Sequence, residues 1–287
     1  MRLDIDGRNC ELESGRSILD AVKKEGLDSI MLSDRPLAAQ IGGEVFNLRF
    51  TPKKDTQIHL LRYGEDMGRR VYERTLQFLF ILAMRKEFPR ARVCVRYSLG
   101  PGLFITVDGM EEPFNEEAAL KVETEMRRLV RLKLPLERRR ISIKEALSFY
   151  EQDGQADKAK LLKWRRFSYF DVYQIDGYMD YFYGEMAPDT SYADVFRVKY
   201  VHDGAVVLLM PRSDAPDVPS DYVDLPKLHA VFHQSDEWGK LMECATVNDL
   251  NTHIQNGTIR ELVRINEALH DRGYADIADK IVQKGAK

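Results

Sequence analysis

The alternation of hydrophobic and polar positions predicts a small mixed unit at the start of the chain. Residues 3–7 alternate and then reach a glycine, which predicts a strand that enters a turn. Residues 18–24 have helical spacing after a serine cap, and residues 36–48 predict two strands around a Gly-Gly hairpin turn. Residues 56–61 add a closing strand. This order of elements is a β-grasp pattern over residues 1–62.

Residues 63–212 predict one α+β domain, because long segments with the amphipathic spacing of helices are separated by short segments with the alternating pattern of strands. Its first helix ends at Pro89, and Ser142 with Glu145 forms a capping-box pattern further on. The expected elements are a helix over 65–88, a hairpin over 92–97 and 103–109, helices over 115–133 and 142–154, a strand over 171–183, and a hairpin over 194–201 and 205–210 that turns at residues 202–204.

The segment 213–224 predicts a linker, because Pro, Ser and Asp dominate it. Past the linker, residues 225–287 read as helical, with one short helix between Thr246 and Gly257 and two more over 258–272 and 274–283. The predicted fold class is therefore α+β: an N-terminal β-grasp domain, an α+β domain with antiparallel sheet and long helices, and a helical C-terminal segment.

Composition narrows the class of protein. The chain has 287 residues, of which 44% are hydrophobic and 31% charged, as in soluble globular proteins with two or three domains. Its longest apolar run, residues 78–84, is far shorter than a membrane span, and its first residues lack the apolar stretch of a secretory signal. Cys10, Cys94 and Cys244 are far apart, so we expect reduced thiols in a cytoplasmic protein without membrane contact.

The segment from Trp164 to Met186 is unusually rich in aromatic residues, and arginines are frequent before it. Arginine planes and exposed rings together can hold unpaired bases and phosphates. We therefore treat nucleotide or RNA binding as a hypothesis, with ring packing in the core as the default alternative. The candidate phosphate contacts are Arg69, Arg70, Arg165 and Arg166.

Two other patterns are weaker. His229 and His233 have the spacing of a two-histidine metal pair, but no HExxH pattern and no clear third ligand accompany them, so a surface or packing role is favoured. The segment from Gly100 to Gly102 is glycine-rich, yet the sequence contains no GxxxxGK[ST] phosphate loop. We interpret it as a hairpin turn, and we expect neither a catalytic nor a metal site.

The first unit resembles a TGS domain, the ubiquitin-like module of threonyl-tRNA synthetases and some GTPases. The similarity rests on Gly15-Arg-Ser-Ile-Leu-Asp-Ala21, Leu37-Ala-Ala-Gln-Ile-Gly-Gly43 and Pro52-Lys-Lys-Asp55. It implies a regulatory or RNA-associated module without an active site.

Residues 74–89 and the stretch from Tyr97 to Phe104 resemble the second additional domain of threonyl- and alanyl-tRNA synthetases. In that family a helical His-x-x-x-His and a later Cys-x-x-x-His form the site that hydrolyses mischarged tRNA. Those four positions correspond here to Arg74, Phe78, Phe182 and Met186, so the resemblance implies that editing by a bound zinc ion is absent. The expected remnant is a degenerate cleft that binds a ligand through Arg74, Phe78, Tyr181, Phe182, Tyr183 and Met186.

The order of the parts is similar to the N-terminal half of bacterial uridine-kinase-like nucleoside kinases. This resemblance rests on Pro226-Lys-Leu-His-Ala-Val-Phe, Gly257-Thr-Ile-Arg-Glu-Leu-Val-Arg and Ala278-Asp-Lys-Ile. It implies a non-catalytic accessory region beside an absent P-loop kinase domain, and ATP and magnesium are expected only for that domain. The alternatives are a free-standing editing-type hydrolase and a docking or oligomerisation module.

Overall fold

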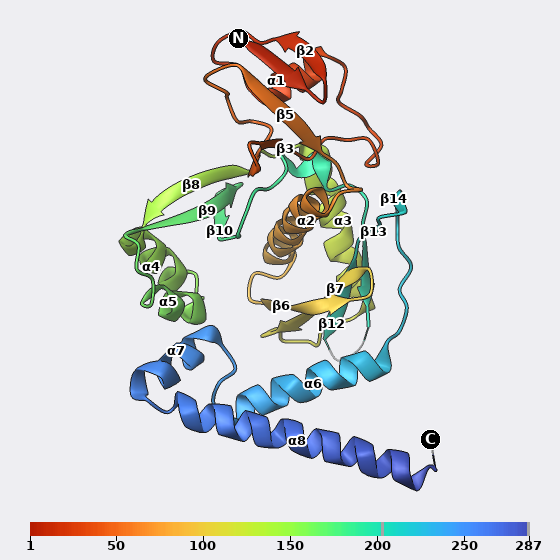
Figure 1. The fold of residues 1–287 in the computed structure, drawn as a ribbon, viewed down its shortest axis with the longest axis vertical. Helices are drawn as coiled ribbons and strands as arrows, with labels where there is room; N and C mark the ends of the chain where they lie inside the picture. The colour runs from red at the N-terminus through yellow and green to blue at the C-terminus, as the bar shows by residue number, and fades with distance from the viewer. Residues whose placement is uncertain (202–203, 286–287) are drawn as a thin grey trace. The chain divides into compact units, whose positions relative to one another are not determined.

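The computed structural model describes residues 1–201 and 204–285, and it divides the chain into two compact units. The first unit comprises Met1–Arg140 and Asp171–Leu225, and the second comprises Ile141–Phe170 and the chain from Pro226 onward. The fold is mixed α+β with several antiparallel sheets and a helical end, as the sequence predicts (Figure 1).

The N-terminal part of the first unit is a five-stranded sheet in the order β2-β1-β5-β3-β4, with α1 packed on it. Strands β1 and β5 pair in parallel and their neighbours pair antiparallel, which gives the β-grasp arrangement. The predicted helix and Gly-Gly hairpin are confirmed, whereas the sequence missed β2. The elements are β1 (Arg2–Ile5), β2 (Arg8–Glu11), α1 (Ile18–Lys24), β3 (Ala38–Ile41), β4 (Glu44–Phe46) and β5 (Thr56–Leu61).

Local signals explain why α1 forms where it does. The hydroxyl of Ser17 accepts a hydrogen bond from the backbone N–H of Asp20, and the Asp20 carboxylate accepts one from the Ser17 N–H. This reciprocal capping box satisfies two donors that would otherwise lack partners at the helix start. Ile18 and Val22 then bury their side chains completely against the sheet.

The rest of the first unit packs α2 and α3 beside a four-stranded antiparallel sheet in the order β11-β12-β7-β6 (Figure 1). Helix α2 has the predicted bounds to within a residue, and Asn115 caps α3 by accepting a hydrogen bond from the Ala118 N–H. One continuous hydrophobic cluster includes both Ile58 of β5 and Phe80 of α2, so the β-grasp part and the larger part share a core. The elements are α2 (Asp66–Glu87), β6 (Arg92–Leu99), β7 (Gly102–Asp108), α3 (Glu116–Leu132), β11 (Arg197–Tyr200) and β12 (Ala205–Leu209).

The aromatic segment forms a hairpin, whereas the sequence predicts one long strand over 171–183. Strands β9 (Tyr169–Ile175) and β10 (Tyr178–Asp180) pair antiparallel across a turn at Asp176 and Gly177. Strand β8 (Glu137–Ser142), which the sequence also missed, pairs with β9 and completes a three-stranded sheet. Residues 137–140 of β8 are all charged and lack the alternation of apolar and polar residues that predicts a strand. The strand therefore depends on its pairing with β9.

Two further expectations concern the end of the first unit. The predicted hairpin of residues 194–210 is present as β11 and β12, but residues 202 and 203 of its turn lie outside the described residues. The predicted linker, residues 213–224, is not wholly irregular, because it contains β14 (Ala215–Pro219), which pairs antiparallel with β13 (Pro211–Arg212) directly before it. The carboxylate of Asp217 in this hairpin accepts a hydrogen bond from the Ser33 N–H of the β-grasp part, which gives the hairpin a fixed anchor.

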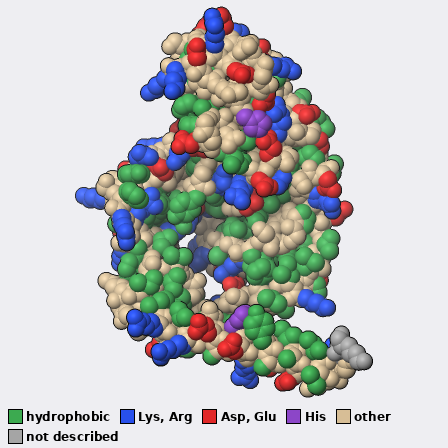
Figure 2. Space-filling view, viewed as in Figure 1, with side chains coloured by type: hydrophobic (Ala, Val, Ile, Leu, Met, Phe, Trp, Pro, Cys, Tyr) green, Lys and Arg blue, Asp and Glu red, His purple; other side chains and the backbone are tan. Residues whose placement is uncertain are grey.

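The second unit is helical. The sequence missed α5 and predicts a break at Gly273, but α8 continues through this glycine because one helical glycine costs only about 1 kcal/mol. Hydrophobic side chains remain exposed along α6 to α8 (Figure 2). They include Leu241, Ile254 and Ile277. Among the described residues, no helix is long and apolar enough to cross a membrane. The helices are α4 (Ile143–Gln152), α5 (Ala156–Leu162), α6 (Pro226–Leu241), α7 (Val247–Asn256) and α8 (Ile259–Gln283).

Candidate functional site

Helix α2 and the segment after β10 bring the four aligned positions of the resemblance together. Arg74 and Phe78 lie one turn apart on α2, so they share a face of the helix. The Arg74 side chain hydrogen-bonds the backbone of Glu185, and the Phe78 ring contacts the Phe182 ring. The spatial neighbourhood expected from the resemblance is therefore present.

The interior half of this neighbourhood is filled by apolar side chains. Phe78 and Met186 have no exposed surface. The Phe78 ring packs against the rings of Tyr178 and Phe182, with centroid distances of 5.8 and 5.3 Å. Neither a phenylalanine nor a thioether in this packing offers the nitrogen or thiolate that a zinc ion requires.

The outer half of this neighbourhood is polar, and the Arg74 side chain lies across it. The Nε of Arg74 donates a hydrogen bond to the Glu185 carbonyl at 2.9 Å, and burial lowers the pKa of the guanidinium. Gly184 adopts φ +104°, and a Cβ added there would lie 3.0 Å from Arg74 Cζ. The Glu185 carboxylate accepts a hydrogen bond from the Tyr173 hydroxyl at 3.0 Å and pairs with Arg138. Glycine is needed at 184 for both its conformation and the close approach of arginine.

Buried polar contacts hold the segment after β10 against α2. The Thr75 hydroxyl accepts a hydrogen bond from the Ala187 N–H at 2.9 Å and donates one to the Val71 carbonyl at 2.8 Å. The Asn47 side-chain amide of the β-grasp part donates to the Met186 carbonyl at 2.8 Å. The bonds from Ala187 to Thr75 and from Asn47 to Met186 hold the backbone around Met186 in place, and the Met186 side chain is buried in the core.

Of the six residues expected to floor a ligand cleft, Phe78 and Met186 are buried, Arg74, Tyr181 and Phe182 are half-buried, and Tyr183 is exposed. The burial of Phe78 and Met186 does not fit direct contact with a ligand, which corrects that part of the expectation. Phe182 is half-buried against Phe78. Tyr181 is half-buried and packs edge-on against Tyr183, which is 75% exposed.

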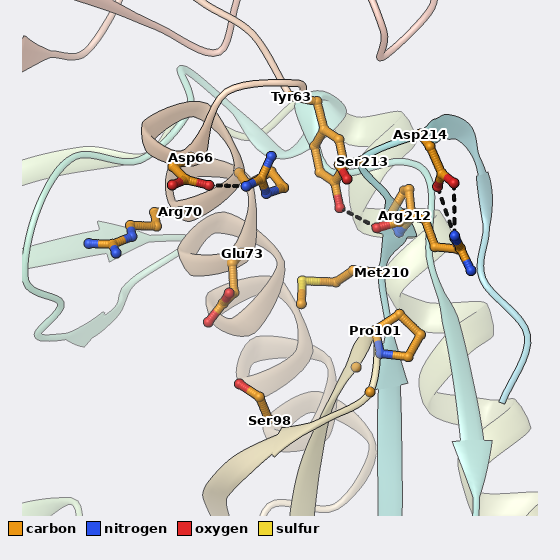
Figure 3. A pocket seen from close by; sticks show the side chains of 14 residues that line it. Tyr63, Asp66, Arg70, Glu73, Ser98, Pro101, Met210, Arg212, Ser213 and Asp214 are labelled. Atoms are coloured by element: carbon orange, nitrogen blue, oxygen red, sulfur yellow. Dashed lines mark hydrogen bonds and ion pairs between the residues drawn. The ribbon is translucent and has the colours of Figure 1, made fainter. Parts of the chain in front are cut away.

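A cavity of about 740 Å³ lies farther toward the start of α2; we name it the α2 cavity. Tyr63 lines one side of the cavity, and its hydroxyl donates a hydrogen bond to the Pro211 carbonyl at 2.6 Å. Burial raises the pKa of Tyr63. Figure 3 shows the side chains that α2, the β6–β7 turn and the β12–β13 junction contribute. They include Asp66, Arg69, Arg70, Glu73, Ser98, Pro101, Met210, Arg212, Ser213 and Asp214.

The charges of the α2 cavity are mixed. Arg69 pairs with Asp66 and donates to the Gly64 carbonyl, while Arg212 pairs with Asp214 at 2.8 Å (Figure 3). Arg70 is exposed at the cavity. Arginines that line an open cavity provide contacts for phosphate groups.

One acidic group in the α2 cavity differs from the others. Burial raises the pKa of the Glu73 carboxyl, and this effect outweighs the opposing charges of Arg74 and Arg70. Gln77 donates a hydrogen bond to Glu73 at 3.0 Å. A half-buried carboxyl with a raised pKa in a cavity is a candidate for accepting and donating protons. Glu73 is not among the residues predicted from the sequence, and its position directly before Arg74 is its one local signal there.

The candidate phosphate contacts separate between the two units. Arg69 and Arg70 line the α2 cavity, whereas Arg165 and Arg166 belong to the second unit. Arg165 packs over the Phe170 ring at 4.8 Å from its centroid and donates to the Tyr169 carbonyl. Packing thus accounts for Arg165, whereas a phosphate contact by Arg166 stays a prediction and only Arg69 and Arg70 line the α2 cavity.

The two histidines with metal-pair spacing lie on α6. The rings of His229 and His233 on α6 lie 6.4 Å apart. Across residues 1–201 and 204–285, no group of three or more His, Cys, Asp and Glu side chains has an arrangement that could hold a metal ion. The role of the pair in packing or at the surface stays a prediction.

Comparisons with known proteins give partial similarities. No family model matches the chain. The threonine–tRNA ligase of Clostridium kluyveri is 25% identical over 194 residues, which cover 67% of this chain and 30% of the ligase. The ligases of Carboxydothermus hydrogenoformans and Acetivibrio thermocellus are 27% identical over 175 residues and 28% over 160, covering 58% and 55% of this chain and 26% and 24% of the ligases.

The chain thus spans less than a third of the length of these curated relatives. It is similar to the N-terminal regions of threonyl-tRNA synthetases, and this similarity supports the TGS-like and editing-like interpretation.

Proposed function

We propose that this chain is an editing-type module that binds the acceptor end of a tRNA without hydrolysing it by metal chemistry. The observation that carries the proposal is the replacement of the four aligned ligand positions by Arg74 and an apolar cluster, within a chain similar to threonine–tRNA ligases. Such a module keeps the shape that receives RNA and lacks the groups that would activate a water molecule there.

The α2 cavity is the proposed site of contact. RNA affinity comes largely from neutralising phosphates, and Arg69, Arg70 and Arg212 line this cavity. Arg69 and Arg212 are paired with carboxylates in the unbound chain, so RNA binding exchanges an intramolecular pair for a phosphate contact. Arg70 is exposed and is therefore the most direct probe of the site.

The test is a tRNA binding titration at several salt concentrations, with wild type, Arg70→Gln and Arg16→Gln. Arg16 is an exposed arginine of the β-grasp part outside the α2 cavity, so its variant is the matched control. We expect Arg70→Gln to weaken binding and to reduce the salt slope by about 1, as for the loss of one phosphate contact. Equal affinities and slopes for all three proteins contradict the cavity assignment.

Hydrolysis by a different route is the second candidate function, because one observation favours it. Glu73 lines the same cavity and burial raises its pKa, as expected for a general base that does not depend on metal. Release of the amino acid from a mischarged tRNA by wild type, and its loss in Glu73→Gln, would support an editing-type hydrolase. Absence of turnover in wild type leaves the binding module as the better account.

We also propose that the module belongs to a longer protein with a nucleoside kinase domain. This rests on the sequence resemblance of residues 226–232, 257–264 and 278–281 to uridine-kinase-like proteins. The kinase domain in cis would be a partner and would supply the ATP and magnesium chemistry. Sequencing the reading frame past residue 287 tests it: a GxxxxGK[ST] motif within a few tens of residues supports the kinase parent, and a stop codon contradicts it.

A further inference from the structure

A second cavity of about 700 Å³ lies where the turn after β4 meets β8 and β9, within the first unit. We name it the turn pocket. One wall consists of Phe46, Arg49 and Phe50, and the opposite wall includes Arg138, Arg139 and Tyr173. Residues 46–50 and 138–139 are far apart in the chain, so no local pattern in the sequence predicts this pocket.

Hydrogen bonds from both walls to one backbone segment make the turn pocket preformed. Asn47 donates to the Met186 carbonyl at 2.8 Å, and the Nε of Arg49 donates to the Pro188 carbonyl at 3.0 Å. On the other side, the Tyr173 hydroxyl donates to the Gly184 carbonyl at 3.2 Å. A ligand therefore meets walls that are already ordered, which lowers the entropic cost of binding.

The first wall offers an aromatic surface. The Phe50 N–H donates to the Asn47 carbonyl at 2.9 Å, and this turn brings the Phe46 and Phe50 rings to a centroid distance of 4.5 Å. Phe50 is 38% exposed, although burial of a phenylalanine is the usual outcome. Exposed rings at the wall of a cavity provide a platform on which a nucleobase can stack.

The arginines of the pocket keep part of their positive charge available. Arg139 donates to the neutral side-chain amide of Gln174 at 2.6 Å, and its side chain is exposed. Arg49 is exposed; its Nε donates to a neutral carbonyl, and its Nη2 forms an ion pair at 3.6 Å with Asp189, which does not line the pocket. Arg138, in contrast, is bound by the carboxylates of Asp171 and Glu185.

Acidic side chains also line the pocket and set a limit on the ligand's charge. Glu44, Glu137 and Glu185 are among its lining residues. Glu44 and Glu137 are exposed, so water screens them, whereas the Glu185 carboxylate is satisfied by Tyr173 and Arg138. A ligand with one phosphate and a base that can donate hydrogen bonds to carboxylates fits this lining better than a highly charged one.

We infer that the turn pocket binds a single nucleoside monophosphate unit, with its base stacked on Phe46 and Phe50 and its phosphate on Arg49 and Arg139. The unit can be a free nucleotide or an unpaired nucleotide of an RNA, since the chemistry of recognition is the same. This site is separate from the α2 cavity, so the inference does not depend on the proposed function.

Calorimetric titration of the full chain tests the inference with two kinds of ligand. One arm uses the four ribonucleoside monophosphates up to several millimolar, and the other uses short single-stranded oligoribonucleotides. The variants are Phe50→Leu, which keeps an apolar side chain but removes the ring, and Arg139→Gln, which removes the charge at an exposed position. The control is Arg16→Gln, at an exposed position that lines neither cavity, and thermal unfolding checks that every variant is folded.

We expect each pocket variant to weaken binding about tenfold, equivalent to about 1.4 kcal/mol, and the control to leave mononucleotide affinity unchanged. Binding confined to monophosphates identifies a free nucleotide as the source, and binding confined to oligonucleotides identifies RNA. The inference is overturned if neither kind of ligand binds wild type, or if both pocket variants bind as wild type does.

Discussion

The guanidinium of Arg74 on α2 lies over the backbone of Glu185, to whose carbonyl it donates a hydrogen bond at 2.9 Å. In the resemblance to editing domains, position 74 would hold a metal-binding histidine. Here the arginine fastens the segment after β10 to the helix, and one turn later Phe78 fills the interior. Arg74 and Phe78 therefore make packing contacts at positions where the resemblance would place metal ligands.

The first prediction concerns this apolar filling. Phe78→Ala should lower the free energy of unfolding by about 3 to 5 kcal/mol, because it leaves a cavity among buried rings. Tyr183→Ala, in the same aromatic neighbourhood but 75% exposed, should change it by less than about 0.5 kcal/mol. Urea unfolding measures both; equal effects would mean that Phe78 is not held in the core.

The second prediction concerns Thr75, whose hydroxyl accepts the Ala187 N–H. Thr75→Val should cost about 1 to 3 kcal/mol, because a buried donor loses its partner. Thr124 is the matched control, since its hydroxyl also donates to the carbonyl four residues earlier but is exposed. Chemical denaturation should show a clearly smaller loss for Thr124→Val.

The third prediction tests the close approach of Arg74 to Gly184. Gly184→Ala should destabilise the chain by about 1 to 3 kcal/mol from backbone strain alone, with an added cost for displacing the guanidinium. Gly177→Ala is the control, because Gly177 also has positive φ but nothing lies within 4 Å of an added Cβ. The extra cost of Gly184→Ala should disappear in an Arg74→Ala background; if it persists, the contact with Arg74 is not its cause.

The fourth prediction is a pH dependence at the junction of β5 and α2. The ring nitrogens of His59 lie 2.7 Å from a Glu65 carboxylate oxygen and 2.8 Å from one of Asp6, and these hydrogen bonds raise the pKa of His59. Arg62, which pairs with Asp6, also faces this cluster.

Because the folded pKa of His59 is raised, its contribution to stability is fully present below about pH 6.5 and is lost as pH rises through the raised value. The half-exposed ring is screened by water, so we expect a difference below about 1 kcal/mol between pH 6 and pH 9. The comparison of wild type with His59→Gln in urea at both pH values measures it. A larger contribution at pH 9 than at pH 6 would contradict the assignment.

The sequence predicts elements well where a local signal marks them. Ser17, Asn115 and Thr246 each cap the helix that follows, and in each case the side-chain oxygen accepts a backbone N–H of the first turn. Strand β8 has no such signal, because its exposed arginines become a strand through pairing with β9 and through ion pairs such as Arg140 with Asp171.

The site was predictable only in part, for the same reason. The resemblance to editing domains predicts that Arg74 and Phe78 lie near residues 182–186. In the structure Arg74 contacts Glu185, and Phe78 contacts Phe182. The complete burial of Phe78 depends on tertiary contacts that periodicity does not encode. The α2 cavity depends on contacts such as that between Tyr63 and Pro211, which are 148 residues apart in the chain.

The most direct measurement is a paired assay of one mischarged tRNA for binding and for release of its amino acid, with and without added zinc. We expect wild type to bind the tRNA, Arg70→Gln to bind it more weakly, and neither zinc condition to produce turnover. Stoichiometric zinc binding together with zinc-dependent turnover, or no tRNA binding at all, would contradict the proposed function.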